Sequence, residues 1–314
     1  MSFEPPSIYT HMQAAVDIVA QSPHPDNKIA ATIAGIDNAG APFALSRTNY
    51  WPEAIVKTIG TVTSIGNSSG TIHAETACIL HAPATAGASL FITDPPCPNC
   101  MKNMAEAGIK ALYIDHKGFD KDWAARRGES FDSMSMRIAE KAGLDVFVVY
   151  RKKQRFEVIS RHPPGYKPAV ESPPRIAPFE GGFENLIEAA HGEMKDEPFA
   201  LAVAADAEGK RFSILTIRHP TIGYTSETME KRDVKYSFIL HPLARALMIA
   251  AREGLKIEPG HVYSSRVPTA RELVNLVGVG ISELRIGDLE SARDEDALTA
   301  LGQLSKAGIL TCKN

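Results

Sequence analysis

Two cysteines, Cys97 and Cys100, lie three residues apart where a helix is expected to begin. This spacing places both sulfurs on one side of the helix, where the free backbone N–H groups of its first turn favour thiolates. Two thiolates are half of a tetrahedral zinc site, and His73, which is also expected to open a helix, supplies a third ligand. Three protein ligands leave the fourth position free for water. The pattern therefore predicts one catalytic Zn²⁺ per chain.

Glu75 follows His73 by two residues and is the candidate proton carrier of this site. Two thiolates and a neutral imidazole bring the zinc close to zero net charge, while the metal still lowers the pKa of its water. A carboxylate beside the metal can take a proton from that water and pass it on. The alternative is a purely structural zinc with a fourth ligand, but His81 lies about two helical turns from His73, too far to share the metal. Cys78 is expected to be a small core residue.

The motif formed by His73-Ala74-Glu75 and the segment Pro96-Cys97-Pro98-Asn99-Cys100 resembles that of the zinc-dependent cytidine and deoxycytidylate deaminase superfamily. The resemblance implies that His73, Cys97 and Cys100 hold zinc and that Glu75 is the proton shuttle. It also implies hydrolytic removal of an amino group from C4 of cytosine or C6 of adenine, with release of ammonia. The enzyme class expected from it is a zinc-dependent hydrolase acting on C–N bonds in cyclic amidines, which has a place in nucleotide metabolism.

Three further residues are expected to contact the substrate. Members of the superfamily place an asparagine at the end of the second strand to hydrogen-bond the sugar, and Asn49 falls there. Ala74 lies inside the motif, between the metal ligand and the proton shuttle. Trp51 can stack on a base or merely cover the mouth of the pocket. The alternative for Asn49 is the turn chemistry common at strand ends.

The base and the branch of the superfamily stay open at the level of the sequence. The segment Thr71 to Glu75 and the segment Ser135 to Gly143 resemble the deoxycytidylate deaminase branch, which favours a cytidine or dCMP type of substrate. However, Ala54 to Gly66 contains none of the additional cysteines or histidines usual in that branch. Asp115 to Gly118 distantly resembles a loop of tRNA adenosine deaminases. Asp115 and His116 follow a strand, where ligands bind in α/β sheets, although a capping or turn role is equally open.

The order of elements in the first half is expected to be a helix, a hairpin, and then alternating helices and strands. Hydrophobic periodicity predicts a helix over Met12 to Ala20, and two strands over Ile29 to Ile36 and Phe43 to Thr48. A helix is expected from near His73, and another follows a strand over Ser89 to Thr93. The fold class expected is α/β, with the three-layer α/β/α fold of the cytidine deaminases.

The second half repeats this order and is expected to be a degenerate copy of the first. Its hairpin has the strands Leu201 to Ala205 and Phe212 to Ile217 around a turn with the same Asp and Gly positions. The segment Leu240 to Ala246 resembles Ile72 to Ala77, with the glutamate replaced by leucine. We infer an internal duplication whose second copy lost the metal. The positions of its lost zinc site are His241, Leu243, Thr269 and Glu272.

The chain is expected to contain two domains, because 314 residues exceed one ordinary domain. The predicted division is a deaminase domain over 1–155, a proline-rich linker over 156–182 and a degenerate deaminase-like domain over 183–314. The two copies would form an internal pseudo-dimer, and a homodimer of whole chains stays open. Any β/α-rich domain shows a similar order of elements, which is the alternative to duplication.

Composition indicates an ordinary globular protein, with 44% hydrophobic and 23% charged residues. The sequence contains no long apolar run and no secretory signal at its start, so we expect a cytoplasmic protein with no membrane association. The net charge of −3 argues against extended nucleic-acid binding, and the basic run Arg151 to Arg155 is interpreted as a solvated end of a domain.

Three functions from two classes compete. The favoured one is deamination of a free nucleobase, nucleoside or nucleotide. The first alternative applies the same chemistry to a base in tRNA or single-stranded nucleic acid, which requires a basic groove and aromatic platforms. The second alternative is a non-catalytic nucleotide-binding regulatory module, and the intact Glu75 argues against it.

Overall fold

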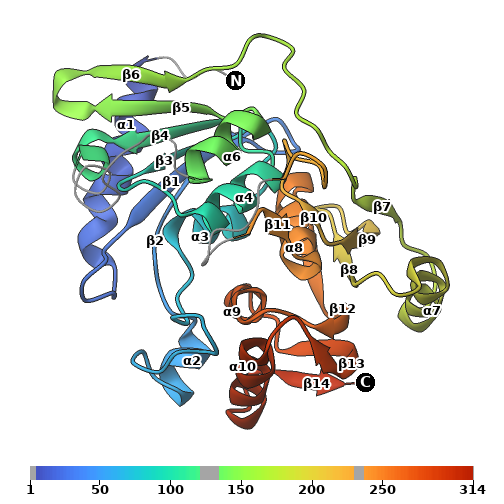
Figure 1. Cartoon of the computed structure of the whole chain (residues 1–314). Helices are drawn as coiled ribbons and strands as arrows, with labels where there is room; N and C mark the ends of the chain where they lie inside the picture. Colours follow the sequence, from blue (N-terminus) through green and yellow to red (C-terminus); the bar gives the residue numbers. More distant parts are fainter. Residues whose placement is uncertain (1–4, 121–133, 230–236, 314) are drawn as a thin grey trace.

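The computed structural model describes residues 5–120, 134–229 and 237–313. These residues form two six-stranded mixed sheets with helices on both faces, and a short two-stranded ribbon lies between them (Figure 1). The fold class is therefore α/β, as the sequence predicted. We call the sheet of strands β1 to β6 with its helices the first unit, and the sheet of β7 to β9 and β12 to β14 with its helices the second unit.

The first sheet has the strand order β2-β1-β3-β4-β5-β6. Strands β3, β4 and β5 run parallel to one another, and β1 is antiparallel to both β2 and β3. Its strands are β1 (Ala30–Ile36), β2 (Pro42–Thr48), β3 (Ser89–Ile92), β4 (Ala111–Asp115), β5 (Asp145–Tyr150) and β6 (Arg155–Ser160).

Helices cover both faces of the first sheet, which gives three layers. Helix α1 packs on one face, where Ile8 and Met12 meet Phe91, Tyr113 and Phe147. The other face carries α3, α4 and α6, which lie between this sheet and the second unit in Figure 1. The helices are α1 (Pro5–Ile18), α2 (Glu53–Thr58), α3 (Ala74–His81), α4 (Pro98–Glu106) and α6 (Met134–Ala142), with short 3₁₀ turns at Val19–Gln21 and Arg151–Lys153.

The second sheet has the strand order β14-β13-β12-β8-β9-β7. Here β12, β13 and β14 run parallel, while β8 is antiparallel to both β9 and β12. The strands β9-β8-β12-β13-β14 thus have the order and directions of β2-β1-β3-β4-β5 in the first sheet. The strands are β7 (Arg175–Pro178), β8 (Phe199–Ala205), β9 (Arg211–Ile217), β12 (Lys256–Val267), β13 (Glu283–Ala292) and β14 (Thr311–Lys313), and the ribbon is β10 (His219–Pro220) with β11 (Ile239–Leu240).

The helices of the second unit also fall at matching places in the strand order. Helix α7 precedes the hairpin β8–β9, as α1 precedes the hairpin β1–β2. Helix α8 follows its hairpin as α3 does, and α9 lies between two parallel strands as α4 does. Phe183 and Ala190 of α7 pack on the outer face of the sheet against Phe199. The helices are α7 (Phe183–Met194), α8 (Pro242–Glu253), α9 (Ala270–Gly278) and α10 (Glu295–Lys306).

The two hairpin turns are built alike. In the first, Oδ1 of Asp37 accepts hydrogen bonds from the backbone N–H groups of Ala39 and Ala41, and Gly40 has a φ of 82°. In the second, Oδ1 of Asp206 accepts from the N–H groups two and four residues later, and Gly209 has a φ of 83°. An aspartate and a glycine three residues apart therefore set the same turn in both sheets, since glycine adopts a positive φ without strain.

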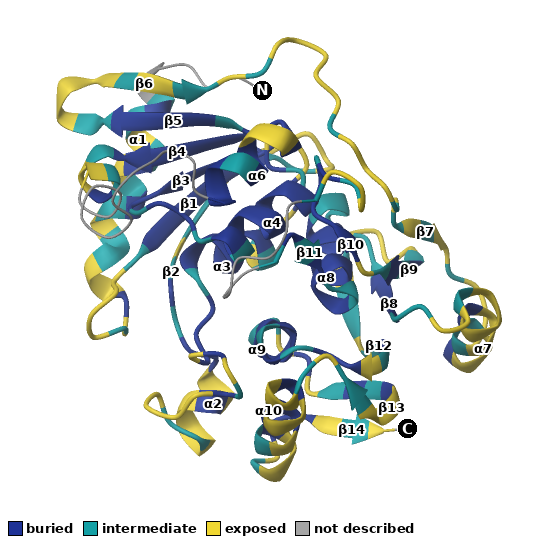
Figure 2. Cartoon of the chain, viewed as in Figure 1, coloured by how far each residue is buried: buried dark blue, intermediate teal, exposed yellow. Residues whose placement is uncertain are grey.

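One hydrophobic core joins the inner helices of both units. It includes Ile79 of α3 and Met104 of α4 together with Leu247 of α8 and Leu273 of α9. Figure 2 shows the inner helices α4 and α8 as largely buried, whereas α7 and α10 present exposed residues. Helices α3 and α4 therefore meet the second unit through their apolar sides.

The segment between the sheets contains more regular structure than the predicted linker 156–182 implied. Strand β6 pairs with β5, and β7 pairs with β9, so both sheets extend into that range. The chain between β6 and β7 has no helix or strand. In the part of the chain that the structure describes, no helix is both long and apolar enough to cross a membrane.

Candidate active site

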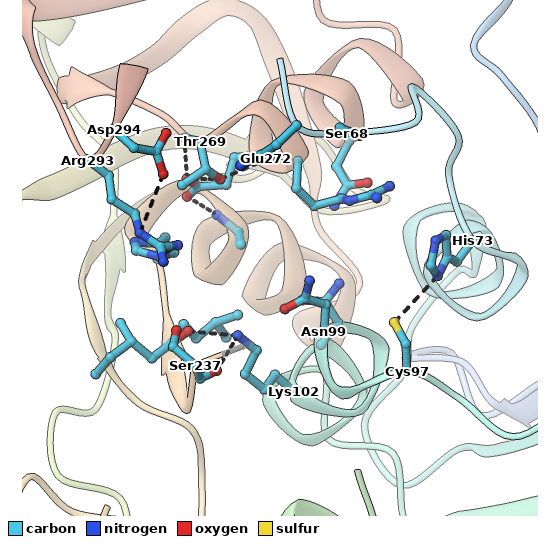
Figure 3. A pocket seen from close by; sticks show the side chains of 18 of the residues that line it. Ser68, His73, Cys97, Asn99, Lys102, Ser237, Thr269, Glu272, Arg293 and Asp294 are labelled. Atoms are coloured by element: carbon cyan, nitrogen blue, oxygen red, sulfur yellow. Dashed lines mark hydrogen bonds and ion pairs between the residues drawn. The ribbon is translucent and has the colours of Figure 1, made fainter. Parts of the chain in front are cut away.

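The three predicted metal ligands lie at the N-termini of two neighbouring helices. His73 is the residue before α3, Cys97 is the residue before α4, and Cys100 lies within the first turn of α4. Nδ1 of His73 is 3.6 Å from Sγ of Cys97 and 3.3 Å from Sγ of Cys100 (Figure 3 labels His73 and Cys97). Pro98 at the first position of α4 fixes the turn that points both sulfurs at His73.

The spacing of these atoms fits one zinc ion. A tetrahedral zinc ion lies about 2.3 Å from a sulfur ligand and about 2.0 to 2.1 Å from a nitrogen ligand. A sulfur and a nitrogen that bind the same zinc are therefore about 3.6 Å apart. The ligand atoms of His73, Cys97 and Cys100 all lie within 4.8 Å of one another, and among the described residues they are the one His/Cys/Asp/Glu group so arranged. The three predicted ligands therefore lie together with a spacing that fits one zinc ion.

Glu75 lies in the first turn of α3, and its side chain is buried with only 3% of the residue exposed. Its Oε2 has no hydrogen-bond partner among the described residues. Burial raises the pKa of this carboxyl to about 7, against the opposing charge of His73. A buried carboxylate oxygen left without a partner beside a metal site has the position and the proton affinity of a general acid or base.

The two thiols differ in their readiness to ionise. A hydrogen bond from Cys100 holds the pKa of Cys97 well below its usual range, although burial opposes this. The pKa of Cys100 is raised by that same bond and by burial. Around them, Oγ1 of Thr76 lies 3.7 Å from Sγ of Cys100 and accepts a bond of 3.2 Å from Nδ2 of Asn103. These bonds fix α3 against α4 at the metal site.

A cavity of about 570 Å³ extends from the metal site to the second unit. Figure 3 shows His73 and Cys97 at one end, Asn99 and Lys102 between, and Arg293 at the opposite end. Lys102 donates to the backbone oxygens of residues 237 and 239 at 2.8 Å, and burial lowers its pKa to about 8. The second unit lines the far side of the cavity with residues that include Ser237, His241, Thr269, Arg271, Glu272 and Arg293.

The three residues expected to contact the substrate, Asn49, Ala74 and Trp51, have different surroundings in the structure. Ala74 is fully buried beside His73. Oδ1 of Asn49 accepts from Ser22 and from the N–H of Ile29, and its Nδ2 donates to a backbone oxygen, which matches the strand-end role left open by the sequence. Trp51 donates to the backbone oxygen of Ser69 and so supports a loop that lines the cavity. None of Asn49, Ala74 and Trp51 lines the cavity itself, so their substrate contacts stay predictions.

Other residues weighed at the level of the sequence have structural partners. Sγ of Cys78 is buried and donates to the backbone oxygen of Ala31, as expected for a core cysteine. His81 contacts the hydroxyl of Tyr50 at 3.1 Å and is outside the metal cluster. Asp115 is buried, and its Oδ1 accepts from the N–H of Lys117 at 2.9 Å, a bond of the capping or turn type that was one of its two interpretations. Its Oδ2 also pairs with Arg151 at 2.5 Å.

Sequence reasoning missed one wall of the cavity. This wall is formed by three polar residues that follow Cys97 on α4: Asn99, Lys102 and Asn103. Their i, i+3, i+4 spacing is that of one helix face, so the sequence contains a signal that could have predicted this wall. Arg271 lies in α9 and Arg293 directly follows β13, and no local pattern connects them with a motif about two hundred residues away.

Comparison with known proteins agrees with this geometry. Residues 7–115 match the family profile described as the cytidine and deoxycytidylate deaminase zinc-binding region, and the match includes His73, Glu75, Cys97 and Cys100. The first unit therefore carries a cytidine-deaminase-like zinc-binding region. No curated protein gives a significant match to the chain.

Two solved structures of a dCMP deaminase from the cyanophage S-TIM5 are similar to part of the chain. One is in complex with dCMP and dUMP, and the other is the apo form. Each has 21% sequence identity and a TM-score of 0.33, and covers 47% of this chain and 100% of its own.

Proposed function

We propose that the chain is a zinc-dependent hydrolytic deaminase of a free cytosine nucleotide, and that Glu75 is its proton carrier. The observation that carries this proposal is the partnerless Oε2 of Glu75, buried beside the three metal ligands. A structural zinc site has no use for such a carboxyl, because an unpaired buried oxygen costs stability unless water or a substrate meets it. The proposal assigns that oxygen to proton transfer.

His73, Cys97 and Cys100 would hold the ion. Zinc, when bound, supplies a Lewis acid that lowers the pKa of water toward neutrality. Glu75, whose pKa near 7 suits transfer in both directions, would take one proton from water and pass it to the ring nitrogen of the base. It would then take the second proton from the hydroxyl group now on the ring carbon and give it to the leaving amine. The C–N bond breaks, ammonia leaves, and the product has a carbonyl whose oxygen came from water.

The cavity supports a free nucleotide as the substrate over a base within a polymer. A volume of about 570 Å³ falls in the usual range for small-molecule sites. The second unit lines its far side, which favours a bounded ligand. Arg293, at the end of the cavity away from the zinc site, would favour a phosphate group there. Lys102 lies between the two ends, and Arg271 donates to the backbone oxygen of Thr71 near the metal site, so both would add positive charge along the cavity.

We infer that the second unit is a degenerate copy of the first, and that it completes the cavity as a partner subunit would. The shared strand order, the matching helices and the matching hairpin turns support this inference. His241 precedes α8 as His73 precedes α3, and Thr269 precedes α9 as Cys97 precedes α4. Two domains follow from it, but with β6 (Arg155–Ser160) in the first and β7 (Arg175–Pro178) in the second, so we propose a linker of 161–174 in place of 156–182.

Ammonia release tests the proposal. Zinc-loaded protein would be assayed with cytosine, cytidine, CMP, dCMP, AMP and a single-stranded oligodeoxycytidylate. We expect the fastest turnover with a cytosine monophosphate, and a raised KM for that compound in the Arg293→Gln variant. Turnover of the oligonucleotide alone would assign the polymer as the substrate. Release of no ammonia from any compound would contradict the deaminase proposal.

A further inference from the structure

The second unit contains a cavity of its own at the place that corresponds to the metal site of the first unit. It has a volume of about 310 Å³ and lies where β12 and β13 end and where α8 and α9 begin. In the first unit, His73 and Cys97 occupy the equivalent place, beyond β3 and before α3 and α4. This edge of an α/β sheet is where such folds bind ligands.

The side chains in this cavity cannot replace the zinc ligands. Glu272 stands where Cys100 does, and both of its oxygens are engaged: Oε1 accepts from the N–H of Ala244, and Oε2 accepts from the N–H and the hydroxyl of Thr269. Arg293 donates to Nε2 of His241 at 3.0 Å, so a guanidinium charge lies directly beside the histidine ring. The cavity therefore has a lining that disfavours cations.

The charge of the lining instead suits an anion. The charged residues that line it are Arg218, Arg266, Arg293 and Glu272, so arginines outnumber carboxylates three to one. Arg218 bonds Glu197 at 3.0 Å, and Arg266 donates to the backbone oxygen of Asp196 at 3.2 Å. A guanidinium has five N–H donors, so each arginine retains donors for a ligand. The carboxylate of Glu272 is already satisfied by backbone and hydroxyl donors.

The lining also has an apolar part beside the arginines. Phe199 and Val267 are almost fully buried, and prolines 198, 242 and 268 contribute further apolar surface. The arginines are exposed at its edge, with 58% of the Arg218 side chain and 41% of the Arg293 side chain accessible. An apolar wall with a cationic edge matches a small molecule that has a flat apolar body and a phosphate group.

We propose that this cavity is a second, metal-free binding site for a phosphorylated small molecule of about the size of a nucleoside monophosphate. The site is separate from the zinc site, but His241, Thr269, Glu272 and Arg293 line both cavities. Arg218 and Arg266 line only the second cavity. They are therefore the residues whose replacement tests this site and leaves the zinc cavity intact.

The test is a calorimetric titration of the full-length, zinc-loaded chain with UMP, which has no amino group for deamination. We expect the Arg218→Gln/Arg266→Gln double variant to bind one UMP fewer per chain than wild type. Each single variant should weaken that site about tenfold or more, because it loses a charge-assisted hydrogen bond. The matched control is Arg175→Gln, which removes an exposed arginine that is also paired with a glutamate but lines neither cavity.

Both targeted arginines are exposed, so the double variant should keep the melting temperature of wild type. Equal UMP stoichiometry and affinity in wild type and the double variant would overturn the proposal. So would binding of a single-stranded oligonucleotide that depends on these arginines when UMP does not bind. The titration measures no deamination, so its outcome is independent of the function proposed for the zinc site.

Discussion

Arg245 and Glu106 form a buried ion pair between the two units, with Nε of Arg245 3.0 Å from Oε1 of Glu106 and at most 1% of either side chain exposed. Glu106 ends α4, whose first turn carries the metal-binding cysteines, and Arg245 lies near the start of α8. Nε2 of His219 meets the other oxygen of Glu106 at 3.0 Å. The helix of the metal site is thus held to the second unit by charge as well as by apolar packing.

Replacing Glu106 by glutamine should destabilise the whole chain. The change leaves Arg245 buried without its carboxylate, and loss of one partner of a buried pair costs about 3–5 kcal/mol. Urea unfolding at pH 7 measures this loss. The control is Glu193→Gln, which breaks the exposed pair with Arg175 and should cost about 0–1 kcal/mol. Equal effects of the two variants would show that the buried pair does not hold the units together.

The Glu106 pair should also fail in acid. Burial raises the pKa of Glu106, but His219 and Arg245 outweigh it, so the pKa lies below 4.5 in the folded chain. A lowered carboxyl pKa gives stability that is present above the unfolded-state pKa and is lost as the pH falls through the folded-state value. The stability difference between wild type and Glu106→Gln should therefore shrink below about pH 4.5. A difference that stays constant down to pH 3 would contradict this assignment.

Glu75 should give the opposite pH dependence in the metal-free protein. Its pKa is raised from 4.5 to about 7, so its contribution to stability is complete below pH 4.5 and is lost as the pH rises through 7. Glu75→Gln should therefore gain up to about 3 kcal/mol relative to wild type between pH 4.5 and pH 8. Urea unfolding in the presence of a chelator measures the gain. The exposed Glu188→Gln should show none, and a wild-type pH profile in Glu75→Gln would refute the burial argument.

Zinc content should follow the first unit alone. Wild-type protein should contain one zinc per chain, and Cys97→Ser or Cys100→Ser should reduce this severalfold, because a serine hydroxyl is a poor zinc ligand. His241→Ala removes the corresponding histidine of the second unit and should leave the zinc content at one. Elemental analysis of dialysed protein decides this. Two zinc ions in wild type, or loss of zinc in His241→Ala, would place a metal in the second unit.

The loop before the metal site should tolerate no side chain at Gly66. This residue has a φ of 52°, and a Cβ on it would lie 2.2 Å from the backbone oxygen of Asp296 in α10. Gly40→Ala is the matched control, because Gly40 also has a positive φ but has no atom within 4 Å of such a Cβ. The control should cost about 1 kcal/mol, and Gly66→Ala should cost clearly more. Thermal unfolding measures both, and equal costs would mean that this loop does not pack on α10 as described.

The metal site was predictable because its residues lie within one local motif. His73 and Cys97 both precede helices, and the order of elements fixed which strand ends they follow. Lys102 was within reach of the same reasoning, since it shares a helix face with Asn99. The substrate contact of Asn49 is predicted by resemblance alone. Its bonds to Ser22 and Ile29 could not be predicted, because they depend on contacts that the local sequence does not encode.

The arrangement of the two units was less accessible from the sequence. Strand β6 begins with Arg155, the last residue of the basic run, and precedes a proline-rich stretch, so the sequence predicts a linker where the structure has an edge strand. The positions of His241 and Thr269 followed from element order. That Arg293 would line the zinc cavity could not be inferred, because the docking of the two units depends on the whole shared core.

The role of Glu75 is tested most directly by comparing wild type with Glu75→Gln in a steady-state assay of ammonia release from dCMP, with zinc content measured on the same samples. We expect both proteins to contain one zinc per chain. We expect kcat to fall in the variant by about 10²–10⁴-fold or more, because the proton carrier is lost while the metal stays. An unchanged kcat in Glu75→Gln with zinc bound would contradict the role of Glu75 as proton carrier.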